Sequence, residues 1–320
     1  MLANKLIYPR TKANLKQYIN DYDPNLVLGV INEHATAALR YFHTLIQGYL
    51  LKKNEDRKNE GALRLSDWFN RPLVLEEKDT YDQLVYGFTA QSSSVADPFF
   101  TEEVTEYLFR NGKVFGDDLR TFDIQRARDM GTGTYVQARA AFNLPVPKTW
   151  RDLCGYISAS NIKLLEERYE DVSDIDLAVA ASLERHVPGA RAGPVFLCIM
   201  LLQFCTARKA DKFFYENGKD KEIAFTPDQL ENIRSITMAS FLCASTEVSN
   251  MQKWAFEIVS LNNPILSCDD IPSLNLNLWK EASKPGDEEG YEAGGDEGEE
   301  NDDNEEYYGS TSQGLCPAKN

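Results

Sequence analysis

The stretch GPVFLCIMLLQF, residues 193–204, is apolar on almost every side of a helix. A helix that is apolar all round is stable in water only when other elements cover most of its surface. The sequence therefore predicts a central helix, with neighbouring elements packed against it from several sides.

Segments with helical periodicity lie on both sides of residues 193–204, and few stretches alternate with the two-residue period of a strand. Apolar residues that recur three and four positions apart form one face of a helix. Thr226 followed by Pro227 is typical of a helix start, while Ser66 and Pro72 are placed to cap and to end a short helix. The sequence predicts an all-α fold, with helices at 35–50, 63–72, 80–91, 101–110, 117–131, 161–169, 193–217 and 226–245.

The 320-residue chain carries a formal charge of −16, most of it in one place. Residues 286–306 hold 12 acidic residues and no basic one, which leaves about −4 on the rest of the chain. A segment of mostly Gly, Asp and Glu buries too little apolar surface to offset the entropy lost on ordering. We expect a helical domain over 1–285 and a disordered acidic tail over 286–320. This tail is either solvated or binds cations or a basic partner.

Membrane insertion and secretion leave signals that this sequence lacks. No run of about 18 uncharged apolar residues occurs, and the N-terminus has no continuous apolar stretch of the secretory kind. We therefore expect no membrane span and no signal peptide in this chain. Its acidic balance gives no reason to expect a nucleic-acid partner.

A histidine stands in ATAALRYFHTLIQGYL, residues 35–50, where a helix would bury an aliphatic residue. At helical spacing one stripe contains Leu39, Phe42, His43, Ile46 and Leu50, so the imidazole should point inward. Arg40 lies one turn before it. Unpaired polar groups in a core cost a few kcal/mol, so both side chains need partners. His43 is either a core histidine with its hydrogen bonds satisfied or the ligand of a bound group.

Charged residues gather in DIQRARDMG, residues 123–131, and the next segment adds Tyr135 and Arg139. Such density commonly marks a salt-bridged surface helix. Guanidinium groups also bind carboxylates through two parallel hydrogen bonds, so Arg126, Arg128 and Arg139 would equally suit an acidic ligand. Both interpretations remain open on spacing alone.

Seven segments in a fixed order resemble the C-terminal half of the animal haem peroxidase family, and the secreted invertebrate peroxidases most of all. They run from about residue 22 to residue 280 and read NEHATAALRYFHTLIQ, LRLSDWFNRP, FDIQRARDMG, VPGARAGPVFLCIMLLQF, DKFFYEN, FTPDQLENIR and SCDDIPSLNLNLWK. The resemblance implies a mainly helical haem peroxidase domain, incomplete at its N-terminus, and an extracellular location.

The resemblance also implies roles for three residues. His43 matches the proximal histidine that ligates haem iron, and Arg40 and Arg139 match arginines that contact the haem propionates. An imidazole nitrogen suits ferric iron, and carboxylates need charged partners. The implied activity is reduction of hydrogen peroxide with oxidation of phenolic or tyrosyl donors or halides.

The sequence departs from the family pattern in three places. Val136 stands where the family has the asparagine that accepts a hydrogen bond from the proximal histidine, and Met130 replaces a histidine. The distal histidine and arginine belong to an N-terminal half that no segment here resembles, and neither His34 nor His186 matches them. We therefore expect no catalytic residue of the distal side in this chain, and a missing N-terminal half as its partner.

Three functions follow from these observations. The chain is part of an active haem peroxidase, or a catalytically silent haem-binding relative, or a helical interaction scaffold without haem.

Cys243 and Cys268 match a family disulfide, and Cys198 matches a family cysteine for which Cys154 is a candidate partner. A disulfide across the first pair would stabilise the fold by roughly 3 kcal/mol.

Overall fold

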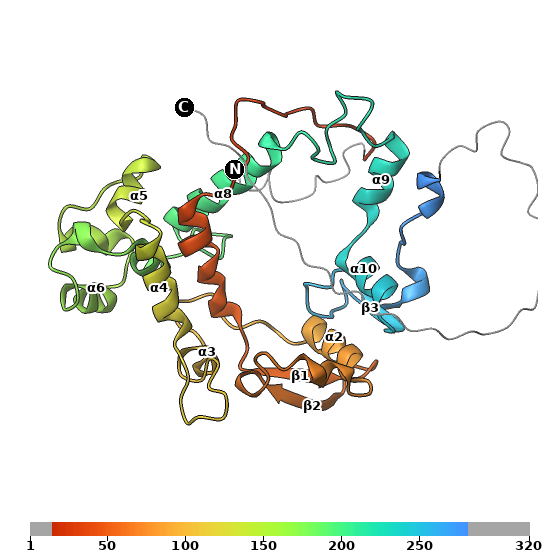
Figure 1. Ribbon diagram of the computed structural model, residues 1–320, viewed down its shortest axis with the longest axis horizontal. Helices are drawn as coiled ribbons and strands as arrows, with labels where there is room; N and C mark the ends of the chain where they lie inside the picture. The colour runs from red at the N-terminus through yellow and green to blue at the C-terminus, as the bar shows by residue number, and fades with distance from the viewer. Residues whose placement is uncertain (1–14, 281–320) are drawn as a thin grey trace, which may run out of the picture. The chain divides into compact units, whose positions relative to one another are not determined.

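The computed structural model of the protein describes residues 15–280 (Figure 1). The expected domain boundary at 285, the acidic tail over 286–320 and Cys316 lie outside the described residues. Within the described part, no helix is both long enough and apolar enough to cross a bilayer.

Most of the regular secondary structure in the described residues is helical, as predicted (Figure 1). The α-helices are α2 (Thr80–Ala90), α3 (Glu102–Thr105), α4 (Leu119–Asp129), α5 (Tyr135–Ala141), α6 (Ala159–Glu166), α7 (Leu177–Leu183), α8 (Pro194–Ala210), α9 (Pro227–Ser235) and α10 (Met238–Ser245). A single π-turn, η1 (His34–Ala38), precedes the short 3₁₀ helices, which are η2 (Arg40–Leu45), η3 (Leu65–Asp67), η4 (Pro72–Glu76), η5 (Trp150–Gly155), η6 (Val172–Asp174), η7 (Cys268–Asp270) and η8 (Leu276–Trp279).

Two antiparallel strand pairs were not expected from the sequence. β1 (Tyr49–Lys53) pairs with β2 (Asn59–Arg64), and β3 (Asn250–Gln252) pairs with β4 (Ile265–Ser267). The prediction of one helix over 35–50 was therefore wrong in its last third. The backbone turns extended at Ile46, with ψ of 130°, and the chain continues into β1.

Helix α2 lies directly on β1 (Figure 1). The approach is close at Gly87, where a Cβ atom would overlap the carbonyl oxygen of Leu51. Only glycine allows the helix and the strand to come so near. This contact joins the hairpin to the helical part of the chain.

The predicted helix at 63–72 was also wrong. Leu63 and Arg64 belong to β2, Ser66 lies inside η3 with its hydroxyl buried and unpaired, and Pro72 begins η4 rather than ending a helix. The backbone N–H of Ser66 donates to Glu103 instead. Sequence periodicity could not reveal this, because the strand is specified by its pairing with β1.

The other helices were predicted at the correct places, but several are shorter. The segment 101–110 forms only the single turn α3, and 226–245 is divided into α9 and α10 by an extended residue, Ile236, with ψ of 134°. Thr226 caps α9 as predicted, accepting from the backbone N–H of Gln229. Local capping was therefore easier to predict than helix length.

The main core forms around α8, against which η1 and α7 pack. Val195, Phe196 and Ile199 are each 0–1% exposed. Further along the same helix, Leu202 and Phe204 are 45% and 55% exposed. The prediction of a helix covered from several sides was thus correct for part of α8 only.

A smaller core joins α2 to α10 and the β3–β4 pair through Val85, Tyr86, Ala239 and Met251. The disulfide between Cys243 and Cys268 closes this core, which confirms the first cysteine pairing. The second suggestion was wrong, since Cys154 and Cys198 are both free thiols.

Candidate proximal haem site

His43 lies on η2, directly after an irregular piece of helix. In η1 the N–H of Leu39 reaches back five residues to the carbonyl of His34, at 3.0 Å. Single π-turns of this kind are frequent at functional sites. The following 3₁₀ helix has three residues per turn, so Arg40 and His43 lie above one another on the same side.

Both side chains meet the same buried carboxylate. Asp123 of α4 has a side chain that is 0% exposed, and its two oxygens take separate partners. Arg40 Nη1 donates to Oδ1 at 3.0 Å, and His43 Nδ1 lies 3.1 Å from Oδ2. Figure 1 shows η1 and η2, in red to orange, beside α4.

Anchors on either side of His43 hold η2 in place. The ring of Tyr41 is 1% exposed in the main core, and its hydroxyl lies 2.8 Å from His186 Nε2. Burial raises the pKa of Tyr41 to about 12, so this hydroxyl stays neutral. Thr44 Oγ1 donates to the Phe99 carbonyl at 2.8 Å. The two anchors fix the direction in which the His43 ring leaves the backbone.

An aromatic ring next to His43 also contacts a second arginine. Phe100 meets the imidazole edge to face, with centroids 5.9 Å apart. The guanidinium of Arg120 lies 5.2 Å from the centroid of the same Phe100 ring and donates to the carbonyl of Ala178. Burial lowers the pKa of Arg120, while its electrostatic interaction with Asp123 acts in the opposite direction. Asp123 therefore interacts with the charges of two arginines, Arg40 and Arg120.

This arrangement fits a haem iron ligand. A carboxylate that accepts a hydrogen bond favours the His43 tautomer with its proton on Nδ1 and its lone pair on Nε2. In the described part of the chain Nε2 makes no hydrogen bond, and the side chain is 30% exposed. Residues 15–280 contain no group of three or more His, Cys, Asp or Glu side chains that could hold a metal ion. Haem needs no such group, because one protein side chain serves as its proximal ligand.

Arg139 occupies a different environment. Its guanidinium is 1% exposed and donates to Glu184 Oε1 at 2.6 Å and to the Pro145 carbonyl at 2.6 Å, while it stacks on Tyr156 at 3.9 Å. Glu184 Oε2 in turn accepts from the N–H of Val195, in the first turn of α8. The structure thus brings Arg40 and His43 together and places Arg139 in a buried ion pair.

The two other constellations have simpler explanations. Arg128 forms two hydrogen bonds with Asp176, at 3.0 and 2.7 Å, which confirms the salt-bridge interpretation for that residue. His34 is 6% exposed and packs edge to face on Phe204, and burial lowers its pKa.

Asp123 is the residue that sequence reasoning missed. The family pattern implied a hydrogen-bond acceptor for His43 at the position of Val136, whose side chain packs against the main core and accepts nothing. Asp123 stands first in the segment DIQRARDMG, in which only the arginines were interpreted as ligands of an acidic group. The available signal for Asp123 was its place on the inner face of a helix whose other charged residues are mostly exposed.

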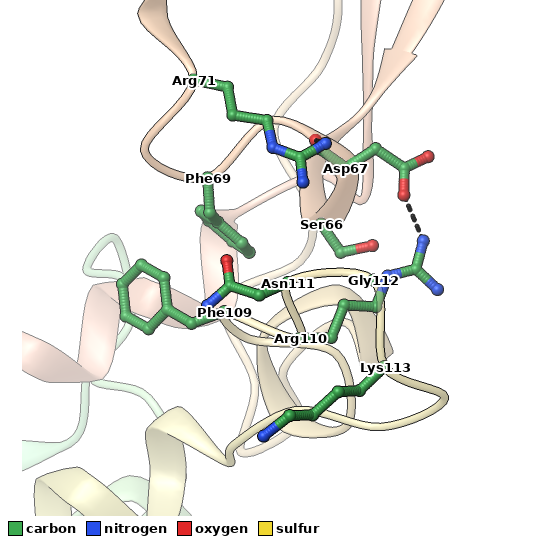
Figure 2. A pocket seen from close by; sticks show the side chains of 9 residues that line it. All are labelled: Ser66, Asp67, Phe69, Arg71, Phe109, Arg110, Asn111, Gly112 and Lys113. Carbon is green, nitrogen blue, oxygen red and sulfur yellow. Dashed lines mark hydrogen bonds and ion pairs between the residues drawn. The ribbon is translucent and has the colours of Figure 1, made fainter.

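A pocket of about 240 Å³ in the described structure contains none of these residues. Figure 2 shows side chains from two loops around it, with an ion pair between Asp67 and Arg110. Its lining is formed by Ser66, Asp67, Phe69, Arg71, Phe109, Arg110, Asn111, Gly112 and Lys113. This pocket is therefore separate from the residues around His43.

Comparisons with known proteins show the family of this chain. Residues 2–256 match the family described as Animal haem peroxidase. A Peroxidase of Drosophila melanogaster is 46% identical over 280 residues, which are 87% of this chain and 40% of that protein. Peroxidasin of Drosophila melanogaster is 32% identical over 269 residues, 82% of this chain and 17% of that protein.

A solved structure shows the same architecture. Peroxidase A of Dictyostelium discoideum superposes with a TM-score of 0.57 at 26% identity, covering 68% of this chain and 42% of that one. The chain spans less than half the length of each of these relatives. From the family match over residues 2–256 and the 46% identity, this chain belongs to the animal haem peroxidase family.

Proposed function

We propose that this chain forms the proximal side of a haem peroxidase, with His43 as the iron ligand. The observation that carries the proposal is the buried carboxylate of Asp123, 3.1 Å from His43 Nδ1, which leaves Nε2 available for iron. Ligating histidines regularly donate their other ring nitrogen to a carboxylate or a carbonyl. Haem bound there would supply the iron that reacts with hydrogen peroxide and the oxidising power for phenolic, tyrosyl or halide donors.

Arg40 is the better placed of the two arginines proposed for the haem propionates. Its Nη1 and Nε are bonded to Asp123 and to the Ala35 carbonyl, and the side chain remains 30% exposed. A carboxylate arriving from the His43 side can approach Nη2. The same role for Arg139 would require the buried ion pair with Glu184 to open.

Peroxide cleavage also needs a distal base, which we assign to a segment outside this chain. His186 is bonded to Tyr41, and His34 is buried against Phe204, so neither of the other two histidines is free for proton transfer at His43. The proposed partner is the N-terminal half of a family domain.

An extracellular location is supported by the disulfide between Cys243 and Cys268, since disulfides persist in oxidising compartments.

The proposed activity is tested with haem and hydrogen peroxide. We expect the chain alone to oxidise a phenol only weakly, and a longer chain that includes a family N-terminal half to do so rapidly and in a His43-dependent manner. Absence of turnover in the longer, haem-loaded chain would leave a catalytically silent haem protein. Absence of haem binding in both chains would leave the helical scaffold.

A further inference from the structure

Two segments of the chain, 66–71 and 109–113, line a pocket that shares no residue with the His43 site (Figure 2). We propose that this pocket binds a small aromatic carboxylate, held between the cationic side chains and the phenylalanine rings of the two segments. The site is separate from the proposed haem site, and its ligand binds whether or not haem is present.

The pocket has an excess of positive charge, although the chain as a whole carries a formal charge of −16. Its three cationic side chains are those of Arg71, Arg110 and Lys113. Asp67, the carboxylate in the lining, forms an ion pair with Arg110 and so balances one of the three. Within residues 15–280 neither Arg71 nor Lys113 has a carboxylate partner, and Arg71 donates to the backbone carbonyl of Asp67 at 3.3 Å. Two unbalanced cations at one pocket favour an anionic ligand.

A buried hydroxyl without a partner belongs to the same lining. Ser66 is 6% exposed, and its Oγ makes no hydrogen bond within the described residues. Its backbone N–H donates to Glu103 at 3.2 Å, which fixes the position of the residue. Figure 2 shows the Ser66 side chain between Asp67 and the turn at Gly112. A buried polar group is costly when unpaired, and a carboxylate oxygen in the pocket would accept the missing hydrogen bond.

Two aromatic rings give the pocket an apolar wall. Phe69 and Phe109 both line it, with ring centroids 5.2 Å apart and planes tilted by 60°. Phe109 is 42% exposed and has a φ of 51°. Bulky residues rarely adopt this left-handed conformation, and strained backbone of this kind gathers at binding sites. A flat ring of the ligand would pack against these side chains and shield them from water.

The volume of the pocket sets the size of the ligand. At about 240 Å³ it lies below the range of roughly 300–1,000 Å³ that drug-sized ligands occupy. It therefore suits one ring with one carboxylate rather than several rings. The Arg71 guanidinium can meet that carboxylate with two parallel hydrogen bonds, and Lys113 adds charge from the other segment.

The first test is a titration of the isotope-labelled, haem-free 320-residue chain with benzoate, followed by NMR. Without haem, no iron competes for the carboxylate. We expect saturable shifts in the amide signals of residues 66–71 and 109–113. Benzyl alcohol has the ring without the charge and acetate has the charge without the ring, so each should bind about tenfold more weakly. Equal affinity for benzoate and either of these probes, or shifts that do not saturate, would overturn the proposal.

The second test uses variants of the lining. Arg71→Gln should raise the dissociation constant of benzoate about tenfold, because a charged hydrogen-bond donor is lost. Ser66→Ala should also weaken binding, yet leave the thermal unfolding of the ligand-free chain unchanged or raised, because the hydroxyl has no partner to lose. This split between affinity and stability distinguishes a ligand contact from a structural one.

Lys163→Gln is the matched control, since it removes one exposed cation from α6, outside the pocket. It should leave benzoate affinity unchanged. Unchanged affinity in Arg71→Gln or Ser66→Ala, or an equal loss in Lys163→Gln, would show that benzoate does not bind at this pocket. None of these outcomes bears on His43, so the proposed haem site is tested independently.

Discussion

The two arginines that the family pattern singles out differ in burial, one at the proposed haem site and one in the core. Arg40 and His43 are each 30% exposed and share Asp123. Arg139 and Glu184 are 1% and 0% exposed, and bond each other. The family pattern alone implies that Arg40 and Arg139 both contact haem propionates. Their different burial instead indicates that Arg139 has a structural role.

The buried pair should therefore matter for folding in the absence of haem. In Arg139→Met, Glu184 remains buried without its cation, and we expect a loss of about 3–5 kcal/mol in the free energy of unfolding. Arg168→Met is the control, because its ion pair with Glu167 is between side chains that are 69% and 48% exposed. That variant should change stability by less than about 1 kcal/mol. Urea denaturation of the haem-free proteins measures both, and equal small losses would contradict the structural role of Arg139.

At the scale of elements, the sequence predicted what local signals determine. The positions of α2, α4, α6, α8 and α9 and the cap at Thr226 follow from periodicity and capping chemistry. The hairpin β1–β2 and the partner of His43 depend on contacts between residues far apart in sequence, Asp123 being 80 positions from His43. No local pattern specifies which distant helix will supply a carboxylate.

One link between elements should show in the pH dependence of stability. Burial alone raises the pKa of Asp176, but hydrogen bonds from Arg128 and Tyr169 outweigh it and hold the pKa below its usual value. A lowered pKa in the folded state means that Asp176 stabilises the fold above its unfolded pKa of about 3.9, and that this stabilisation is lost as the pH falls.

Asp176→Asn should accordingly destabilise the chain at neutral pH, and the difference from the wild type should shrink as the pH falls below about 4. Asp174→Asn, at an exposed position two residues earlier, should show no such difference. Thermal unfolding across this pH range measures it. A stability difference that stays constant with pH would exclude the proposed linkage.

The disulfide gives a second prediction at this scale. Cys243 and Cys268 close a loop with a sequence separation of 25, so replacing both with serine should lower the free energy of unfolding by roughly 3 kcal/mol. Cys154→Ser removes an exposed free thiol and should have little effect. Equal denaturation midpoints for the three proteins would show that the bond does not constrain the chain.

At the scale of the whole molecule, the chain matches 40% of the length of its Drosophila melanogaster relative named Peroxidase. The sequence predicted a central helix with other elements packed on several sides, whereas Leu202 and Phe204 on α8 remain 45% and 55% exposed. Composition shows that a segment is apolar, but it does not show whether the described residues suffice to cover it. Likewise, the sequence predicts that the His43 ring points inward, but it does not show what covers Nε2, the ring nitrogen that does not contact Asp123.

The most direct measurement of the central claim is a haemin titration of the full 320-residue chain beside the His43→Ala and His186→Ala variants. His186 is exposed, and Tyr41 keeps its ring buried in the core without it, so this variant controls for adventitious binding of haemin to a surface imidazole. We predict a Soret band that saturates near one haem per chain in the wild type and in His186→Ala, and that is lost or shifted in His43→Ala. Identical spectra for the wild type and His43→Ala would contradict the assignment of His43 as the iron ligand.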